Sequence, residues 1–139
     1  MRKFISFVLV FLLIGIIVWM FAATVQAAYE DDLYILSHVI TGEAEGCSRD
    51  MKLSVGSVVL NRVSDDRFPD TIAEVVFQPG QYACTWDGNY YREPSQDTID
   101  IAVELLEDGT AIDESVVWQT EFPQGIGVYD IIGNMYFCY

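Results

Sequence analysis

The sequence predicts an α+β domain of about four helices followed by a small antiparallel β-sheet near the C-terminus. Between residues 31 and 106, apolar side chains recur at spacings of three and four residues, which is the period of a helix. From residue 116 onward, short apolar runs are separated by glycine and asparagine, which is typical of strands joined by tight turns. Because helices and strands occupy separate stretches of the chain, the α+β class is favoured.

Residues 1–28 are expected to lie outside this domain. A two-residue basic head precedes an uncharged apolar run, residues 4–23, and residues 25–27 have the small side chains of a signal-peptidase cleavage site. A run of about 20 apolar residues could also cross a bilayer if it stayed uncleaved. We therefore expect a signal peptide or an uncleaved membrane anchor over 1–28, and an exported domain over 29–139.

Four helices are predicted from apolar stripes and from their start and stop signals. A serine or threonine cap, or a terminal glycine, bounds each of them. The predicted stretches are 31–45, 48–62, 71–77 and 95–109. The inward stripe of the second helix is Met51, Val55, Val58, Val59 and Arg62, and that of the fourth is Ile99, Ala102, Val103 and Leu106.

The remaining segments are predicted to be a loop and a sheet. Residues 78–92 show no helical period and are expected to form an ordered surface loop rich in aromatic side chains. Extended runs are expected at 116–118, 127–129, 131–132 and 135–139, with a hairpin turn at Gly133 and Asn134.

Composition limits the possible partners. The formal net charge of the chain is −14, and it becomes more negative without the basic head. Nucleic acid is disfavoured because phosphate binding needs clustered Lys and Arg. Of the three cysteines, Cys84 and Cys138 have apolar flanks and are the expected disulfide pair, although three reduced thiols remain an alternative.

Glu43 is the first candidate for chemistry. It follows Ile40 by three residues and Leu36 by seven, so it projects from the apolar face of the first helix. Such surroundings disfavour the charged carboxylate, so Glu43 is expected to hold a proton and act as a general acid. The alternative is a frayed helix end whose glutamate reaches water. His38 and Glu45 are expected on the solvated side of the same helix.

Other constellations are weaker. His38 is the only histidine and the cysteines lack ligand spacing, so we expect no metal and no cofactor. A Cys–His hydrolase would need His38 to face the other way. The loop residues Tyr82, Trp86, Tyr90 and Tyr91, with Gln81 and Asn89, have the mixture of flat rings and amides that sugar-binding clefts use, although core packing explains any single ring.

Five blocks in order carry a resemblance to a known family. They are ITGEAEG, SVGSVVLNRV, FPDTIAEVVFQPGQYACTWDG, EFPQGIGVY and IGNMYFCY. Together they resemble the SleB-like cell wall hydrolase family, the spore cortex-lytic enzymes and their relatives, from about residue 33 to residue 139.

The resemblance implies a lysozyme-like fold. It also implies an enzyme that resembles lytic transglycosylases and cleaves peptidoglycan glycan strands between N-acetylmuramic acid and N-acetylglucosamine. It implies that Glu43 is the catalytic acid and base. We also expect Gln81, Tyr82, Asn134 and Tyr136 to line the cleft, although packing in the loop and hairpin would explain these residues equally well. The expected molecule is a monomer in the cell wall or spore, in contact with a membrane only through its N-terminal segment.

The sequence departs from the family pattern at Glu45, Cys47 and Met135, where Arg, Glu and His are frequent. The first two departures bear on substrate affinity, and Met135 argues against a catalytic histidine there. Two other functions remain open. One is an N-acetylmuramoyl-L-alanine amidase, and the other is a non-catalytic wall-binding or spore-coat protein of the same fold.

Overall fold

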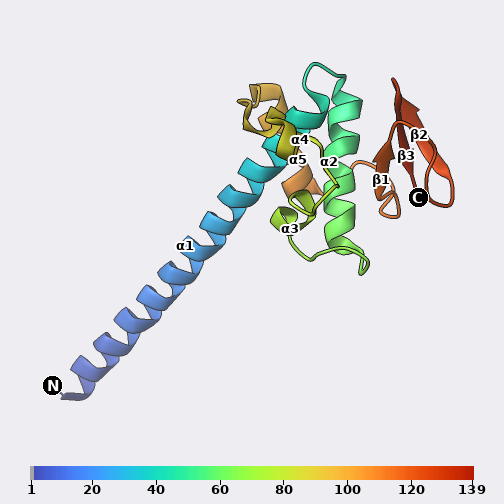
Figure 1. The fold of residues 1–139 in the computed structure, drawn as a ribbon. Coiled ribbons are helices and arrows are strands. Elements are labelled where there is room, and N and C mark those ends of the chain that lie inside the picture. Colours follow the sequence, from blue (N-terminus) through green and yellow to red (C-terminus); the bar gives the residue numbers. More distant parts are fainter. Residues whose placement is uncertain (1) are drawn as a thin grey trace. The chain divides into compact units, whose positions relative to one another are not determined.

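The computed structural model describes residues 2–139 of the chain, with side chains from residue 9 onward. The chain divides into two compact units, one ending at Asp31 and the other starting at Asp32. Figure 1 traces the elements along the chain. The second unit contains the core, the sheet and every candidate site residue.

Helix α1 (Arg2–Ala44) begins far earlier than the predicted first helix. The reason is local, because residues 24–30 contain neither glycine nor proline and continue the helix without a break. From Leu9 to Phe21 its apolar side chains are largely exposed, and a stretch within Leu9–Ala44 is long and apolar enough to cross a membrane by length and composition.

Three further helices confirm the predicted start signals. Helix α2 (Arg49–Ser64) begins after Ser48, α3 (Ile72–Val76) after Thr71, and α5 (Gln96–Asp108) after Ser95. In each, the capping hydroxyl accepts a hydrogen bond from a backbone N–H of the first turn, which satisfies a donor that has no partner inside the helix. The predicted stripe of α2 is buried in full.

Two predictions about the middle of the chain need correction. The expected loop contains α4 (Cys84–Asp87) and a 3-10 turn, η1 (Asn89–Tyr91). The buried face of α5 consists of Thr98, Ile101, Ala102 and Leu105, so Ala102 is buried as predicted, whereas Ile99, Val103 and Leu106 are only half-buried. A helix with apolar residues on adjacent stripes can bury either one, and the contacts of α5 with α2 select this face.

The sheet contains β1 (Trp118–Thr120), β2 (Val128–Ile132) and β3 (Met135–Cys138), in the order β1-β3-β2 with antiparallel pairing. Ile132 pairs with Met135 across the predicted two-residue turn, where Gly133 has a φ of 61°. Val116 and Val117 are buried but precede β1. The predicted α+β class and hairpin are confirmed.

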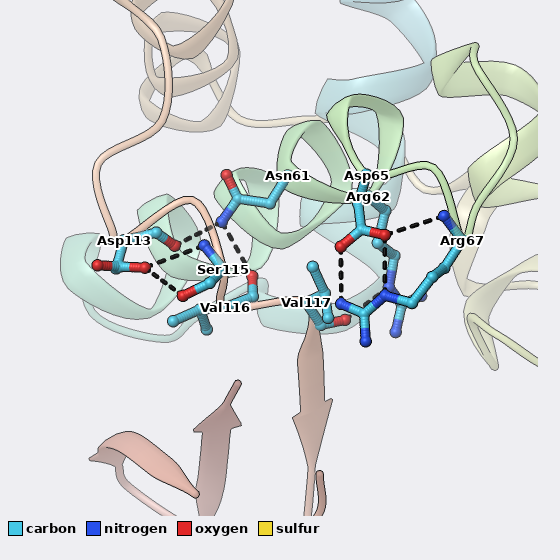
Figure 2. Close-up of polar contacts among 8 residues, drawn as sticks. All are labelled: Asn61, Arg62, Asp65, Arg67, Asp113, Ser115, Val116 and Val117. Carbon is cyan, nitrogen blue, oxygen red and sulfur yellow. Dashed lines mark hydrogen bonds and ion pairs between the residues drawn. The ribbon is translucent and has the colours of Figure 1, made fainter. Parts of the chain in front are cut away.

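Polar side chains at the end of α2 connect the helices to the chain that enters the sheet. Figure 2 shows the Asn61 amide donating to the carbonyls of Asp113 and Val116, both at 2.9 Å. The Arg62 Nε donates to the Val117 carbonyl at 2.7 Å. These bonds fix the start of β1 against the core, to which β3 contributes the fully buried Phe137.

Candidate active site

Glu43 lies in the last turn of α1 and is half-buried. The backbone N–H of Cys84, at the start of α4, donates to Glu43 Oε1 at 3.1 Å. Leu36 and Ile40, on the same face of the helix, are fully buried. Glu43 is therefore held at the edge of the core by a neighbouring backbone, and it is not the tip of a frayed helix.

Close packing of the chain on Gly42 makes this hydrogen bond feasible. A Cβ atom added at Gly42 would lie 2.4 Å from Cys84 Cβ and 2.8 Å from Cys84 Sγ. No other residue type could leave α4 in this position beside α1. Gly42 thus determines how near the Cys84 N–H comes to the Glu43 carboxylate.

The buried guanidinium of Arg62 lies next to Tyr82, in the segment that leads to Cys84. Arg62 is only 3% exposed, and its guanidinium carbon lies 5.1 to 5.5 Å from three ring centroids, a cation–π arrangement. The rings belong to Phe68, Tyr82 and Trp118. Tyr82 is two residues before Cys84. Arg62, on α2, therefore helps to hold the segment whose Cys84 N–H contacts Glu43.

Tyr82 was predicted to line the cleft, but its ring is fully buried, so it cannot stack on a sugar. Burial raises the pKa of its hydroxyl to about 12, against the opposing effect of the Arg62 charge. Its hydroxyl has no hydrogen-bond partner among the described residues. Tyr82 is a packing residue of the site.

The predicted Cys84–Cys138 disulfide is not formed, and all three cysteines are free thiols. Cys84 packs against Gly42, whereas Cys138 lies on β3 opposite Trp118 and Val128, so the two sulfurs belong to different parts of the core. Burial raises the pKa of the Cys84 thiol well above its usual range, and the neighbouring Glu43 charge raises it further. Cys84 is therefore a neutral neighbour of Glu43.

The other predicted cleft residues lie in two places. Gln81 is half-buried and belongs to the segment that leads into α4. Asn134 is exposed in the β2–β3 turn, and Tyr136 is half-buried on β3. The turn lies near the start of α2, since a Cβ added at Gly133 would be 3.8 Å from the end of Met51.

His38 and Glu45 are less exposed than predicted. His38 is 5% exposed, and its Nδ1 lies 2.7 Å from the Tyr90 carbonyl oxygen. The rings of Tyr34 and Tyr90 pack on it at 4.1 and 5.3 Å. Glu45 is half-buried, and its Oε2 accepts a long hydrogen bond of 3.5 Å from the Thr98 hydroxyl. His38 is thus a core residue that holds the 89–91 turn.

Sequence reasoning missed two contributors to the site, the Cys84 backbone amide and the buried Arg62. A backbone donor has no signature in the sequence, although Gly42 beside Glu43 could have indicated a close approach. Arg62 was assigned to the inward stripe, but its aromatic neighbours come from distant segments. Among residues 9–139, no group of three or more His, Cys, Asp or Glu side chains is arranged to hold a metal ion.

A family model described as Cell Wall Hydrolase matches residues 46–138, which begin three residues after Glu43. A spore cortex-lytic enzyme of Halalkalibacterium halodurans is 33% identical over 76 residues, 54% of this chain and 23% of that protein. One of Oceanobacillus iheyensis is 27% identical over 81 residues, 58% of this chain and 29% of that protein. The chain thus spans less than a third of the length of these curated relatives.

Two solved structures are similar to this one. The catalytic domain of the Bacillus cereus SleB protein has a TM-score of 0.70 and 20% identity, covering 79% of this chain and 91% of that one. The catalytic domain of the germination-specific lytic transglycosylase SleB from Bacillus anthracis has a TM-score of 0.67 and 21% identity, covering 78% and 93%. These matches confirm the predicted lysozyme-like α+β fold.

Proposed function

The chain belongs to the cell wall hydrolase family, and on this premise we propose that it is a lytic transglycosylase. It cleaves peptidoglycan glycan strands between N-acetylmuramic acid and N-acetylglucosamine, with Glu43 as the general acid and base. The observation that carries this proposal is the half-buried Glu43 carboxylate, held at 3.1 Å by the Cys84 N–H at the end of α1.

One carboxylate is enough for this reaction. Ordinary retaining and inverting glycosidases need a second carboxylate as nucleophile or to activate water. In the transglycosylase reaction Glu43 first protonates the glycosidic oxygen of the leaving sugar. The C6 hydroxyl of the muramic residue then attacks C1, and its proton passes to Glu43, so the acid form is restored and a 1,6-anhydro end is left.

The surroundings of Glu43 suit both steps. Glu43 is half-buried beside the fully buried Leu36 and Ile40, so its carboxyl group is partly open to a substrate. The Cys84 N–H stabilises the carboxylate that exists between the two proton transfers, because a hydrogen bond to an ionised acceptor is stronger than one to a neutral acceptor. This hydrogen bond therefore supports the step in which Glu43 is ionised.

Asp87 is the best rival for a second acid, since it ends α4 three residues after Cys84, whose N–H binds Glu43. Its two carboxylate oxygens accept hydrogen bonds from the backbone and side-chain nitrogens of Asn89, at 2.8 and 2.9 Å. Asp87 therefore orders its own turn.

We also propose that Gln81, Asn134 and Tyr136 face the glycan strand. The apolar part of α1 is proposed to be the export signal or membrane anchor.

Digestion of purified peptidoglycan by the full chain, followed by mass spectrometry of the products, tests the proposal. We expect muropeptides with 1,6-anhydro ends. Reducing ends would show a hydrolase, and free stem peptides would show an amidase. Retained binding without any product would show a non-catalytic wall-binding protein. Each of the last three results would overturn the transglycosylase assignment.

A further inference from the structure

The short segment from Cys84 to Asn89 covers the turn of α1 that carries Glu43. At its start, the Cys84 N–H bonds to Glu43 Oε1. At its end, the carbonyl carbon of Asn89 would be 3.5 Å from a Cβ added at Gly42. Both ends of the segment thus approach the turn of α1 that carries Glu43, and Trp86 lies two residues after the Cys84 N–H that binds this carboxylate.

Internal hydrogen bonds hold this segment in one conformation. The N–H groups of Thr85 and Asp87 donate to the carbonyls of Tyr82 and Ala83, both at 3.1 Å. The Asp87 carboxylate accepts from both nitrogens of Asn89. A side chain exposed here is therefore displayed by an ordered backbone.

Trp86 is that side chain. It is 61% exposed, whereas Tyr82, Cys84 and Tyr90 around it are at most 4% exposed. Single exposed apolar residues are common, so exposure alone assigns nothing. An exposed indole two residues from the amide that binds the acid of a glycan-cleaving site is different, because its flat face matches the apolar face of a pyranose ring.

Resting on the proposed function, we propose that Trp86 is a substrate-binding residue that stacks on an acetamido sugar next to the scissile bond. The ligand class is a neutral β-linked N-acetylhexosamine. The Asp87 carboxylate places negative charge next to Trp86, which disfavours an anionic ligand. Trp86 thus positions the glycan strand, and Glu43 carries out the proton transfers.

The test measures binding without cleavage. Isothermal titration of chitotetraose into the full-length Glu43→Gln variant, in a detergent without a sugar headgroup, gives the reference dissociation constant. Adding Trp86→Ala should weaken binding at least tenfold, while Trp86→Tyr should keep most of it. The matched control is Phe122→Ala, since Phe122 is 63% exposed but lies in the connection between β1 and β2.

Equal binding by the Glu43→Gln parent and its Trp86→Ala derivative would overturn the inference, and so would the absence of binding by the parent. An equal loss in the Phe122→Ala derivative would also overturn it, because the effect would not be specific to the Glu43 turn. The titration uses a variant that is not expected to cleave the glycan, so it tests binding alone. Failure of the transglycosylase assignment would instead be seen in the digestion products of the unmodified chain.

Discussion

The helical part of the second unit and the sheet bury their side chains very differently. Ten of the sixteen residues of α2 are buried, whereas four of the five residues of β2 are exposed. The helices form a core by packing on one another, but the sheet reaches that core mainly through β3. The part that holds Glu43 is thus rigid by packing, and the sheet depends on a few specific bonds.

Those bonds come from neighbouring residues of α2. Asn61 and Arg62 bind the carbonyls of residues 113, 116 and 117, at the entrance to β1 (Figure 2). A buried carbonyl that loses its donor has no water to replace it. The largest effects on the sheet should therefore come from changes in α2, and not from changes in the exposed strands.

Asn61→Ala is expected to have the largest effect on stability. It leaves the buried Val116 carbonyl without a donor and removes one of the two donors to the Asp113 carbonyl, which still accepts the Val116 N–H at 3.0 Å. Together these losses should lower the free energy of unfolding by about 2 to 4 kcal/mol. Urea denaturation measures this loss, and amide hydrogen exchange should show the fastest gain in β3. The control is Asn134→Ala in the exposed turn, for which a change within about 0.5 kcal/mol is expected. Similar losses in both variants would contradict the account.

Gly42→Ala tests the helical part. The new methyl group would overlap Cys84 Cβ, and relieving that overlap should cost about 1 to 3 kcal/mol in unfolding free energy. It should also move the Cys84 N–H away from Glu43, so peptidoglycan cleavage should fall by more than stability alone explains. Gly15→Ala is the matched control, because nothing lies within 4 Å of its added Cβ. Unchanged cleavage in Gly42→Ala would contradict the role of this contact.

Tyr82→Phe should have the smallest effect near neutral pH, because it removes a hydroxyl that has no partner among the described residues. The difference should appear in alkali. Folding raises the pKa of Tyr82 from 10.0 to about 12, so this contribution to stability is complete below pH 10 and is lost as the pH rises toward 12.

Ionisation of Tyr82 should therefore lower the free energy of unfolding of the unmodified chain by roughly 2 to 3 kcal/mol. Thermal melts at pH 8 and pH 11.5 measure it. Tyr82→Phe should lose less over this interval than the unmodified chain. It should still lose some stability, because the pKa of Tyr90 is also raised to about 12, mainly by burial. An equal loss in both proteins would contradict this assignment.

The sequence was informative where local chemistry decides the structure. The hydroxyls of Ser48, Thr71 and Ser95 start helices as predicted, because a cap needs only its own first turn. Glu43 was selected from helix period alone, and it lies at the edge of the core. The two-residue hairpin turn at residues 133 and 134 was identifiable for the same local reason.

The sequence was uninformative where distant residues decide the structure. Helix α4 has four residues, too few to be stable alone, and it exists because Cys84 meets α1. His38 is buried by Tyr90, which lies 52 positions further along the chain. The free thiols of Cys84 and Cys138 follow from three-dimensional placement, which apolar flanks do not reveal.

The role of Glu43 can be tested most directly by comparing Glu43→Gln with Glu45→Gln, two residues further along the same half-buried helix end. Release of anhydro-muropeptides from peptidoglycan is the readout. Glu43→Gln should reduce the rate by about 10² to 10⁴ while the chain stays folded, and Glu45→Gln should keep most of it. Release by Glu43→Gln at the unmodified rate would contradict the account.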